Sequence, residues 1–241
     1  KPKYIIVFYF ILTQLCLIFS DIFSVTSKED KLNMQKRFLG SENILINRNY
    51  VLHKYEKPFN ERYQNKIIVV GRLEKQKNFI QLLESLKGID CTIDIVGDGS
   101  ERKKIEKLIE NSNLDVNLLG ILSNDDLINL MKNYKIFLSG SLYEGSPKST
   151  LEAMSSGALI VAFENSNISE IIESYENGIL FNDFKLLPEI IRDMIQNEKK
   201  FNIMTKRAYL KIEDEYSLES AIKREIKTYN LITKSRKNLS L

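Results

Sequence analysis

Residues 67–99 read IIVVGRLEKQKNFIQLLESLKGIDCTIDIVGDG, and this stretch decides the fold. It begins with an apolar run over 67–70 that ends at a glycine. Residues 79–86 have the apolar spacing of a helix, and a second apolar run over 92–96 ends at another glycine. Short apolar runs that alternate with helical segments are typical of parallel strands joined by crossover helices. The stretch therefore predicts one strand–helix–strand unit.

The same alternation continues toward the C-terminus. Further apolar runs follow, with helical segments between them, at 116–119, 136–138, 159–162 and 179–181. Strands that helices cover on both faces are apolar along their whole length. The predicted fold class is α/β, with a Rossmann-like parallel sheet between two layers of helices. Ahead of it, residues 20–60 read strand, helix and strand, with Ser27 as the helix N-cap, and Lys54–Asn65 is the predicted linker.

Composition narrows the class of protein. The chain has 241 residues, which is between one and two domains, and a net charge of +3. A dedicated nucleic-acid binder usually carries a strong basic patch, so the near-balanced charge argues against a nucleic-acid partner. The two cysteines, Cys16 and Cys91, form neither a metal-binding spacing nor a disulfide framework, which favours a reducing cytoplasm.

The most apolar stretch is Tyr4–Phe19. It is 16 residues long, whereas a membrane-spanning helix needs about 20. Two interpretations stay open: an element of a fold whose covering partner lies upstream, or contact with a membrane surface. Basic residues from Lys223 to Lys237 allow a second contact with anionic lipid, although interspersed acids favour a solvated helix.

Ligands of parallel α/β sheets bind at the carboxyl ends of the strands, which directs attention to the loops starting at Gly71, Gly97, Gly120 and Ser139. Residues 97–102, GDGSER, carry two glycines of a dinucleotide fingerprint, but Arg102 stands where close packing needs a small residue. An NAD-binding oxidoreductase is thereby disfavoured, and a tight turn is the alternative. In residues 71–79, GRLEKQKNF, Arg72 and Lys77 flank a helix start, which suits a diphosphate; a solvated basic loop is the alternative.

Residues 144–152, EGSPKSTLE, place one carboxylate on a loop and a second one eight residues later in the following helix. A carboxylate can accept hydrogen bonds from two sugar hydroxyls, and the helix start can donate N–H groups to an anion. Glu144 could instead be a solvated loop acid. Ser149 and Glu152 also fit a capping box, which needs no ligand.

With these segments in order, the chain resembles the C-terminal domain of family 4 glycosyltransferases of the GT-B fold. The resemblance covers residues 66–181 and rests on GRLEKQKNF, IVGDGSERKKIEKLI, VNLLGILSNDDL and SLYEGSPKSTLEAMSSGALIVAF. Residues 21–52 resemble the last segment of that family's N-terminal domain. The resemblance implies three domains: residues 1–60, a partial Rossmann-like acceptor-side domain with the linker; 61–200, the nucleotide-sugar-binding domain; and 201–241, the closing helices and a basic tail.

The resemblance also implies roles for single residues. Arg72 and Lys77 match the cations that hold the donor diphosphate, Glu144 matches the acid near the donor sugar, and Glu152 matches the acid that binds the ribose. The implied catalytic residues are Arg72, Lys77 and Glu144. The implied donor-binding residues are Gly71, Gly97, Gly145, Ser146, Ser149, Thr150 and Glu152.

This sequence departs from the family pattern at three places. Asn78 stands at a frequent glycine, Ser146-Pro147 replaces the commoner Phe-Gly, and the N-terminal acceptor loop with its catalytic histidine is not in this sequence. His53 does not match that histidine, and a surface position is its simpler interpretation.

The resemblance implies transfer of a sugar, with retention, from a nucleotide-sugar to a saccharide or lipid-linked acceptor in polysaccharide or glycoconjugate synthesis. A UDP-sugar is favoured over a GDP-sugar, and neither a metal nor another cofactor is implied. The expected location is the cytoplasm, with peripheral contact at the inner face of the membrane. Two alternatives stay open: a donor-binding subunit that needs a separate acceptor subunit, and a truncated, inactive chain.

Overall fold

The structure, a computed structural model, describes residues 3–52 and 62–239. It divides into two compact units, residues 1–50 with 216–241 and residues 51–215. The domain ranges implied by the sequence stay a prediction, because a compact unit need not coincide with a functional domain.

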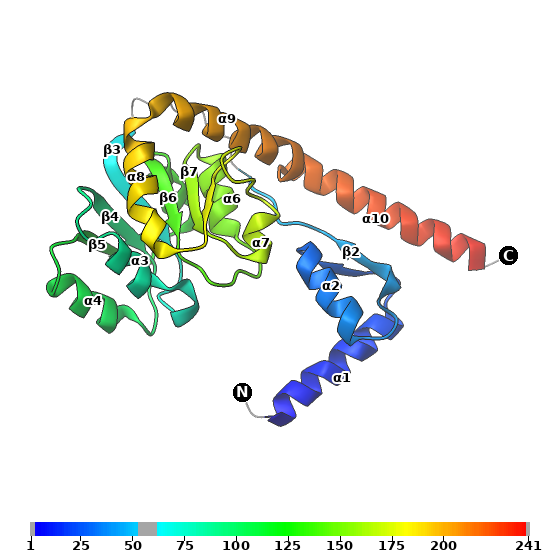
Figure 1. Cartoon of the computed structure of the whole chain (residues 1–241). Coiled ribbons are helices and arrows are strands. Elements are labelled where there is room, and N and C mark those ends of the chain that lie inside the picture. The colour runs from blue at the N-terminus through cyan, green and yellow to red at the C-terminus, as the bar shows by residue number, and fades with distance from the viewer. Residues whose placement is uncertain (1–2, 53–61, 240–241) are drawn as a thin grey trace. The chain divides into compact units, whose positions relative to one another are not determined.

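The unit of residues 51–215 is built on one six-stranded parallel sheet (Figure 1). Its strand order is β5-β4-β3-β6-β7-β8, and every neighbouring pair is parallel. The six predicted apolar runs are confirmed as strands. Their bounds are β3 (Tyr63–Val70), β4 (Thr92–Val96), β5 (Asp115–Gly120), β6 (Tyr134–Ser139), β7 (Leu159–Phe163) and β8 (Ile179–Phe181).

Helices lie on both sides of this sheet, as Figure 1 shows. Their bounds, with the two short 3₁₀ helices, are η3 (Lys75–Lys77), α3 (Phe79–Ser85), α4 (Arg102–Glu110), α5 (Asn124–Met131), α6 (Lys148–Ser155), α7 (Ser166–Ser169), η4 (Phe184–Leu186), α8 (Leu187–Gln196) and α9 (Glu198–Glu215). One face of the sheet packs with α3, α4, α8 and α9 in a single apolar core. The other face carries buried Ile68, Phe137 and Ile160 and contacts α5 and α6. The predicted two-layer covering is confirmed.

The predicted linker Lys54–Asn65 is wrong at its C-terminal end, because β3 begins at Tyr63. The buried Arg62 guanidinium anchors this start: it donates hydrogen bonds to the carbonyl oxygens of Tyr134 (2.9 Å) and Ser156 (2.6 Å). Tyr63 also packs edge-to-face on Tyr134. The polarity of residues 63–65 predicts a linker, but these residues belong to β3 because β6 supplies hydrogen-bond partners for the start of this strand. Residues 53–61, which include His53, lie outside the described residues.

The unit of residues 1–50 and 216–241 contains a small parallel sheet of two strands. The predicted strand, helix and strand are confirmed, and the Ser27 side chain caps the helix as expected. The last helix packs in this unit, where Arg224 donates to the Arg48 carbonyl at 3.2 Å. The bounds are α1 (Lys3–Phe19), β1 (Phe23–Val25), α2 (Lys28–Arg37), η1 (Ser41–Asn43), β2 (Ile44–Ile46) and α10 (Leu218–Leu239).

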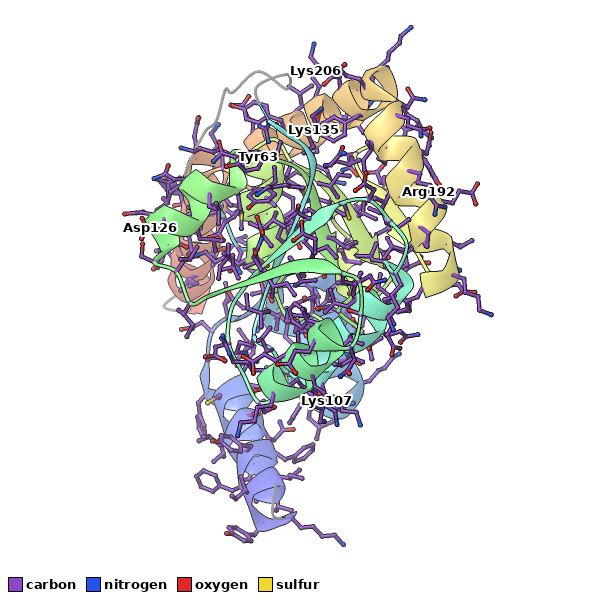
Figure 2. All side chains as sticks on the ribbon, turned by 90° about the vertical axis from the view of Figure 1, so that its left-hand side faces the viewer. Tyr63, Lys107, Asp126, Lys135, Arg192 and Lys206 are labelled. Atoms are coloured by element: carbon purple, nitrogen blue, oxygen red, sulfur yellow. The ribbon has the colours of Figure 1, made fainter. Side chains whose placement is uncertain are left out.

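Helix α1 contains the apolar Tyr4–Phe19 stretch. Leu17 is its one buried residue, and Figure 2 shows the other side chains projecting around the helix. Within the described residues, no helix combines the length and the apolar character needed to cross a membrane. Both interpretations of this stretch, an upstream covering partner and membrane contact, stay predictions.

A close contact between two glycines joins the loops that follow β3 and β4. A Cβ atom on Gly97 would lie 2.0 Å from the carbonyl oxygen of Gly71, and the φ angle of Gly97 is +138°. A Cβ atom on Gly99 would lie 2.6 Å from the carbonyl oxygen of Leu73, which itself is fully buried. Packing between loops therefore accounts for both glycines of the partial dinucleotide fingerprint.

This contact predicts that Gly97→Ala destabilises the chain severely. We expect the free energy of unfolding to fall by at least about 3 kcal/mol, because the added methyl group meets backbone and the φ angle is strained. Gly88→Ala is the matched control, since Gly88 also has a positive φ but open space around it. It should cost about 1 kcal/mol. Urea denaturation measures both values, and equal losses would contradict the packing argument.

Candidate active site

The connections of the sheet reverse direction between two neighbouring strands. From β3 the chain moves through β4 to β5, and from β6 it moves the other way through β7 to β8. In open α/β sheets, the loops at the carboxyl ends of two such strands diverge and leave a crevice for a ligand. The loop after β3 begins at Gly71 and the loop after β6 begins at Gly140, so the sequence-predicted residues 71–77 and 144–152 follow the two strands that define this point.

The first loop is held in a tight shape by Asn78. This residue has a φ angle of +55° and a ψ angle of 37°, the left-handed conformation that asparagine tolerates better than most residues. Its N–H donates to the Lys75 carbonyl and closes η3. Asn78 therefore adopts a left-handed conformation that glycine, the frequent residue at this position of the family, also adopts easily. The turn directs Lys77 back over the strand end, and its side-chain carbons lie 3.4–3.7 Å from where a Cβ of Gly71 would be.

Lys77 and Glu144 meet across the switch point. The Lys77 Nζ donates to the Glu144 Oε1 at 2.5 Å, and the two side chains are only 15% and 12% exposed. Their positions differ by 67 residues in the sequence, so only the fold brings them together. A charge-assisted hydrogen bond with little exposure is stronger than a surface ion pair, because water screens it less. The pair therefore fixes both side chains at the site.

Two asparagines support the loop that carries Glu144, and both lie in or next to α7. Asn165 donates to the Ser141 carbonyl at 3.0 Å, while its Oδ1 caps the Ile168 N–H. The Nδ2 of Asn167 donates to the carbonyl oxygens of Glu144 and of Gly145, the latter at 3.1 Å. Sequence reasoning missed both residues. A signal was present. The polar residues 164–167, ENSN, directly follow the apolar strand β7, which neighbours β6, and Glu144 lies in the loop after β6.

The capping-box alternative for Ser149 and Glu152 is wrong. Helix α6 has Pro147 as its N-cap, and no side chain caps it, because Ser149 already lies inside the first turn. Glu152 is buried, with 7% of its surface exposed, and its carboxylate lies 3.3 Å from the Nζ of Lys148. A buried carboxylate paired with only one exposed lysine is a costly arrangement in an unliganded protein. Glu152 is thus a stronger candidate for ligand binding than the sequence alone suggested.

Several polar groups at this edge have no partner among the described residues. The N–H groups of Gly145 and Ser149 make no hydrogen bond, and a Cβ on Gly145 would meet open space. The Arg72 side chain is exposed, and its guanidinium makes no hydrogen bond or ion pair with the described residues. Such donors and a cation suit an anionic ligand.

The structure brings together only part of the predicted set. Lys77 and Glu144 are paired and Gly71 packs on Gly97, but neither Arg72 nor Glu152 bonds to that pair. Thr150 is buried and its N–H donates to the Pro147 carbonyl. Within the described residues, no three or more His, Cys, Asp and Glu side chains are grouped to hold a metal ion. Metal-independent chemistry stays a prediction.

These features describe an α/β protein that carries a lysine–glutamate ion pair and unpartnered backbone N–H groups at the switch point of a parallel sheet. A family model described as "Glycosyl transferases group 1" matches residues 54–211. The chain belongs to this family.

One curated relative and two solved structures give detail. The poly(ribitol-phosphate) alpha-N-acetylglucosaminyltransferase of Staphylococcus aureus (strain COL) is 28% identical over 219 residues, which are 86% of this chain and 43% of that protein. A crystal structure of an S. aureus TarM variant with fondaparinux, alpha-GlcNAc-glycerol and UDP has a TM-score of 0.77 at 26% identity, covering 86% of this chain and 43% of that one. The crystal structure of Anabaena HepE in complex with UDP and glucose has a TM-score of 0.79 at 18% identity, and the match covers 92% of this chain and 66% of that one.

The last likeness, below 25% identity, shows the GT-B fold alone. The chain spans about half the length of the curated relatives it matches.

The Lys77–Glu144 pair makes a prediction about stability. Lys77→Met should lower the free energy of unfolding by about 2 kcal/mol, because it leaves a poorly solvated carboxylate without its partner. Adding Glu144→Gln should recover part of this loss, since the double variant no longer carries the unpaired charge. Urea unfolding of both single variants and of the double variant gives the coupling energy. Additive losses would mean that the two side chains do not interact in the free protein.

Proposed function

We propose that this chain is the donor-binding part of a glycosyltransferase that moves a sugar from a nucleotide-sugar, with retention, to a saccharide or lipid-linked acceptor. The observation that carries the proposal is the pairing of Lys77 with Glu144 at the switch point, in a chain of the glycosyl transferases group 1 family. A UDP-sugar is the favoured donor, which agrees with the UDP in the TarM complex.

The leaving group of such a reaction is a nucleoside diphosphate, which gains negative charge as the sugar departs. Arg72 and Lys77 would stabilise this charge, as a metal ion does in other enzymes. The unpartnered N–H groups of Gly145 and Ser149 would add hydrogen bonds to the phosphates or the sugar. Arg72 has no partner to give up, whereas Lys77 would share its charge between Glu144 and the diphosphate. The site therefore supplies its own electrostatic stabilisation.

Glu144 is best suited to orient the donor sugar. Its carboxylate is held by Lys77, which reduces its tendency to attack the anomeric carbon but leaves lone pairs free to accept hydrogen bonds from sugar hydroxyls. A covalent double displacement of the glycosidase kind is accordingly not proposed. Glu152 would accept hydrogen bonds from the two ribose hydroxyls, in exchange for part of its contact with Lys148.

The acceptor is a saccharide or a lipid-linked saccharide in polysaccharide or glycoconjugate synthesis. The S. aureus relative is named for a poly(ribitol-phosphate) acceptor, which supports a polymer as the acceptor class. We further propose a cytoplasmic location with peripheral contact at the inner face of the membrane. The exposed apolar side chains of α1 support this contact, because a large contiguous patch of exposed apolar side chains usually marks an interaction site.

Binding of nucleoside diphosphates tests the proposal. Calorimetric titration of the chain with UDP, GDP, ADP and NAD in EDTA should show binding of UDP and not of NAD. Glu152→Ala and Arg72→Ala should each weaken UDP binding at least about tenfold, the loss of one charge-assisted hydrogen bond. Arg192→Ala, at an exposed arginine of α8 labelled in Figure 2, is the matched control and should bind UDP normally.

The outcomes separate the alternatives. Binding of UDP in EDTA that is lost in Glu152→Ala supports the donor site and metal independence together. Binding without transfer to any acceptor would favour a donor-binding subunit. No binding of any nucleotide by a chain that circular dichroism shows to be folded would contradict the proposed function for this chain. A stability loss in Glu152→Ala with unchanged binding would assign the residue a structural role.

A further inference from the structure

Asn167 is a buried polar residue that the proposed chemistry does not use. It lies in α7, only 3% of its surface is exposed, and its Nδ2 donates to two successive carbonyl oxygens, those of Glu144 and Gly145. An amide nitrogen carries two hydrogens, so one side chain can hold both carbonyls at once. The two peptide groups that follow Glu144 and Gly145 are thus tied to the neighbouring loop.

The orientation of the carbonyls fixes the orientation of the N–H groups. In a trans peptide, the carbonyl oxygen of one residue and the N–H of the next point in opposite directions. No cis peptide occurs in the described part of the chain. The carbonyls of Glu144 and Gly145 point toward buried Asn167, so the N–H groups of Gly145 and Ser146 point away from it. Gly145 is exposed, and its N–H has no partner among the described residues.

The hydrogen bonds of Asn167 are incomplete among the described residues. Its Oδ1 is buried and accepts no hydrogen bond, which is unusual for a native buried polar atom. Asn177 offers the contrast: it is equally buried, but its Nδ2 donates to the Ile171 carbonyl at 3.0 Å and its Oδ1 accepts from the Glu173 N–H at 2.7 Å. Asn177 has the full pairing expected of a structural residue, and Asn167 does not.

We infer that Asn167 is a positioning residue, which turns the N–H group of Gly145 toward the donor so that it can bind the phosphates or the sugar. The inference rests on the proposed function and deepens it. An aspartate at this position would present two acceptor oxygens to two carbonyl oxygens, and the repulsion would release the loop. Asn167 acts through the backbone and does not itself touch the donor.

Asn167→Asp tests the inference, with Asn177→Asp as the matched control for loss of a buried amide. NMR titration with UDP and with uridine gives the two dissociation constants even when binding is weak. We expect Asn167→Asp to weaken UDP binding about tenfold or more and to leave uridine binding within about twofold, since only UDP needs the loop. The chemical-shift change of the Gly145 amide on UDP addition should disappear as well. Asn177→Asp should lower thermal stability and leave the ratio of the two constants unchanged.

The results distinguish this inference from the proposed function. If the folded wild-type chain binds none of the nucleoside diphosphates, the proposed function fails and the inference fails with it. If the wild type binds UDP and loses it in Glu152→Ala, but Asn167→Asp keeps the wild-type ratio of UDP to uridine affinity, only the inference is overturned. Should Asn167→Asp not fold, Asn167→Ala removes the same two hydrogen bonds without adding charge, and the same ratio decides.

Discussion

The parallel pairing of β3 with β6 is the constraint on which the site depends. These strands are neighbours in the sheet although 63 residues, from 71 to 133, separate them in the sequence. After β3 the chain continues to β4 on one side of the pair, and after β6 it continues to β7 on the other side. The carboxyl ends of both strands consequently open into the same crevice. Lys77 comes from one strand end and Glu144 from the other, and they form an ion pair with little exposure to water. The proposed roles of Lys77 and Glu144 follow from this adjacency, because the two side chains come from different strand ends.

The loops near the two strand ends are held by contacts to their backbone. Gly97 lets the loop after β4 pack directly against the Gly71 carbonyl, and Asn167 holds two carbonyls of the Glu144 loop. A site that binds a diphosphate through N–H groups needs such support, since a small rotation of a peptide group moves the donor hydrogen out of reach.

The electrostatics of the site fit a reaction in which charge moves onto a leaving group. In the free protein, Lys77 is paired with Glu144 and Glu152 with Lys148, so the charges are largely compensated. In the proposed function, the diphosphate of the donor would compete with Glu144 for Lys77, and the Arg72 guanidinium has no ion pair to give up among the described residues. Membership of the glycosyl transferases group 1 family gives this arrangement its chemical meaning.

The sequence by itself determined the six strands, the helices between them and the loops that carry Arg72, Lys77, Glu144 and Glu152, because hydrophobic periodicity and glycine positions are local signals. It misplaced the start of β3, whose polar residues are held in a strand by Arg62 and by pairing with β6. It left Glu152 open to a capping box, because Pro147 as the N-cap becomes evident only from backbone geometry. It gave no role to Asn167. Tertiary structure alone decided the strand order, the Lys77–Glu144 pair and the two hydrogen bonds of Asn167, since each joins residues more than 20 positions apart and no local pattern records which distant partner a polar side chain meets.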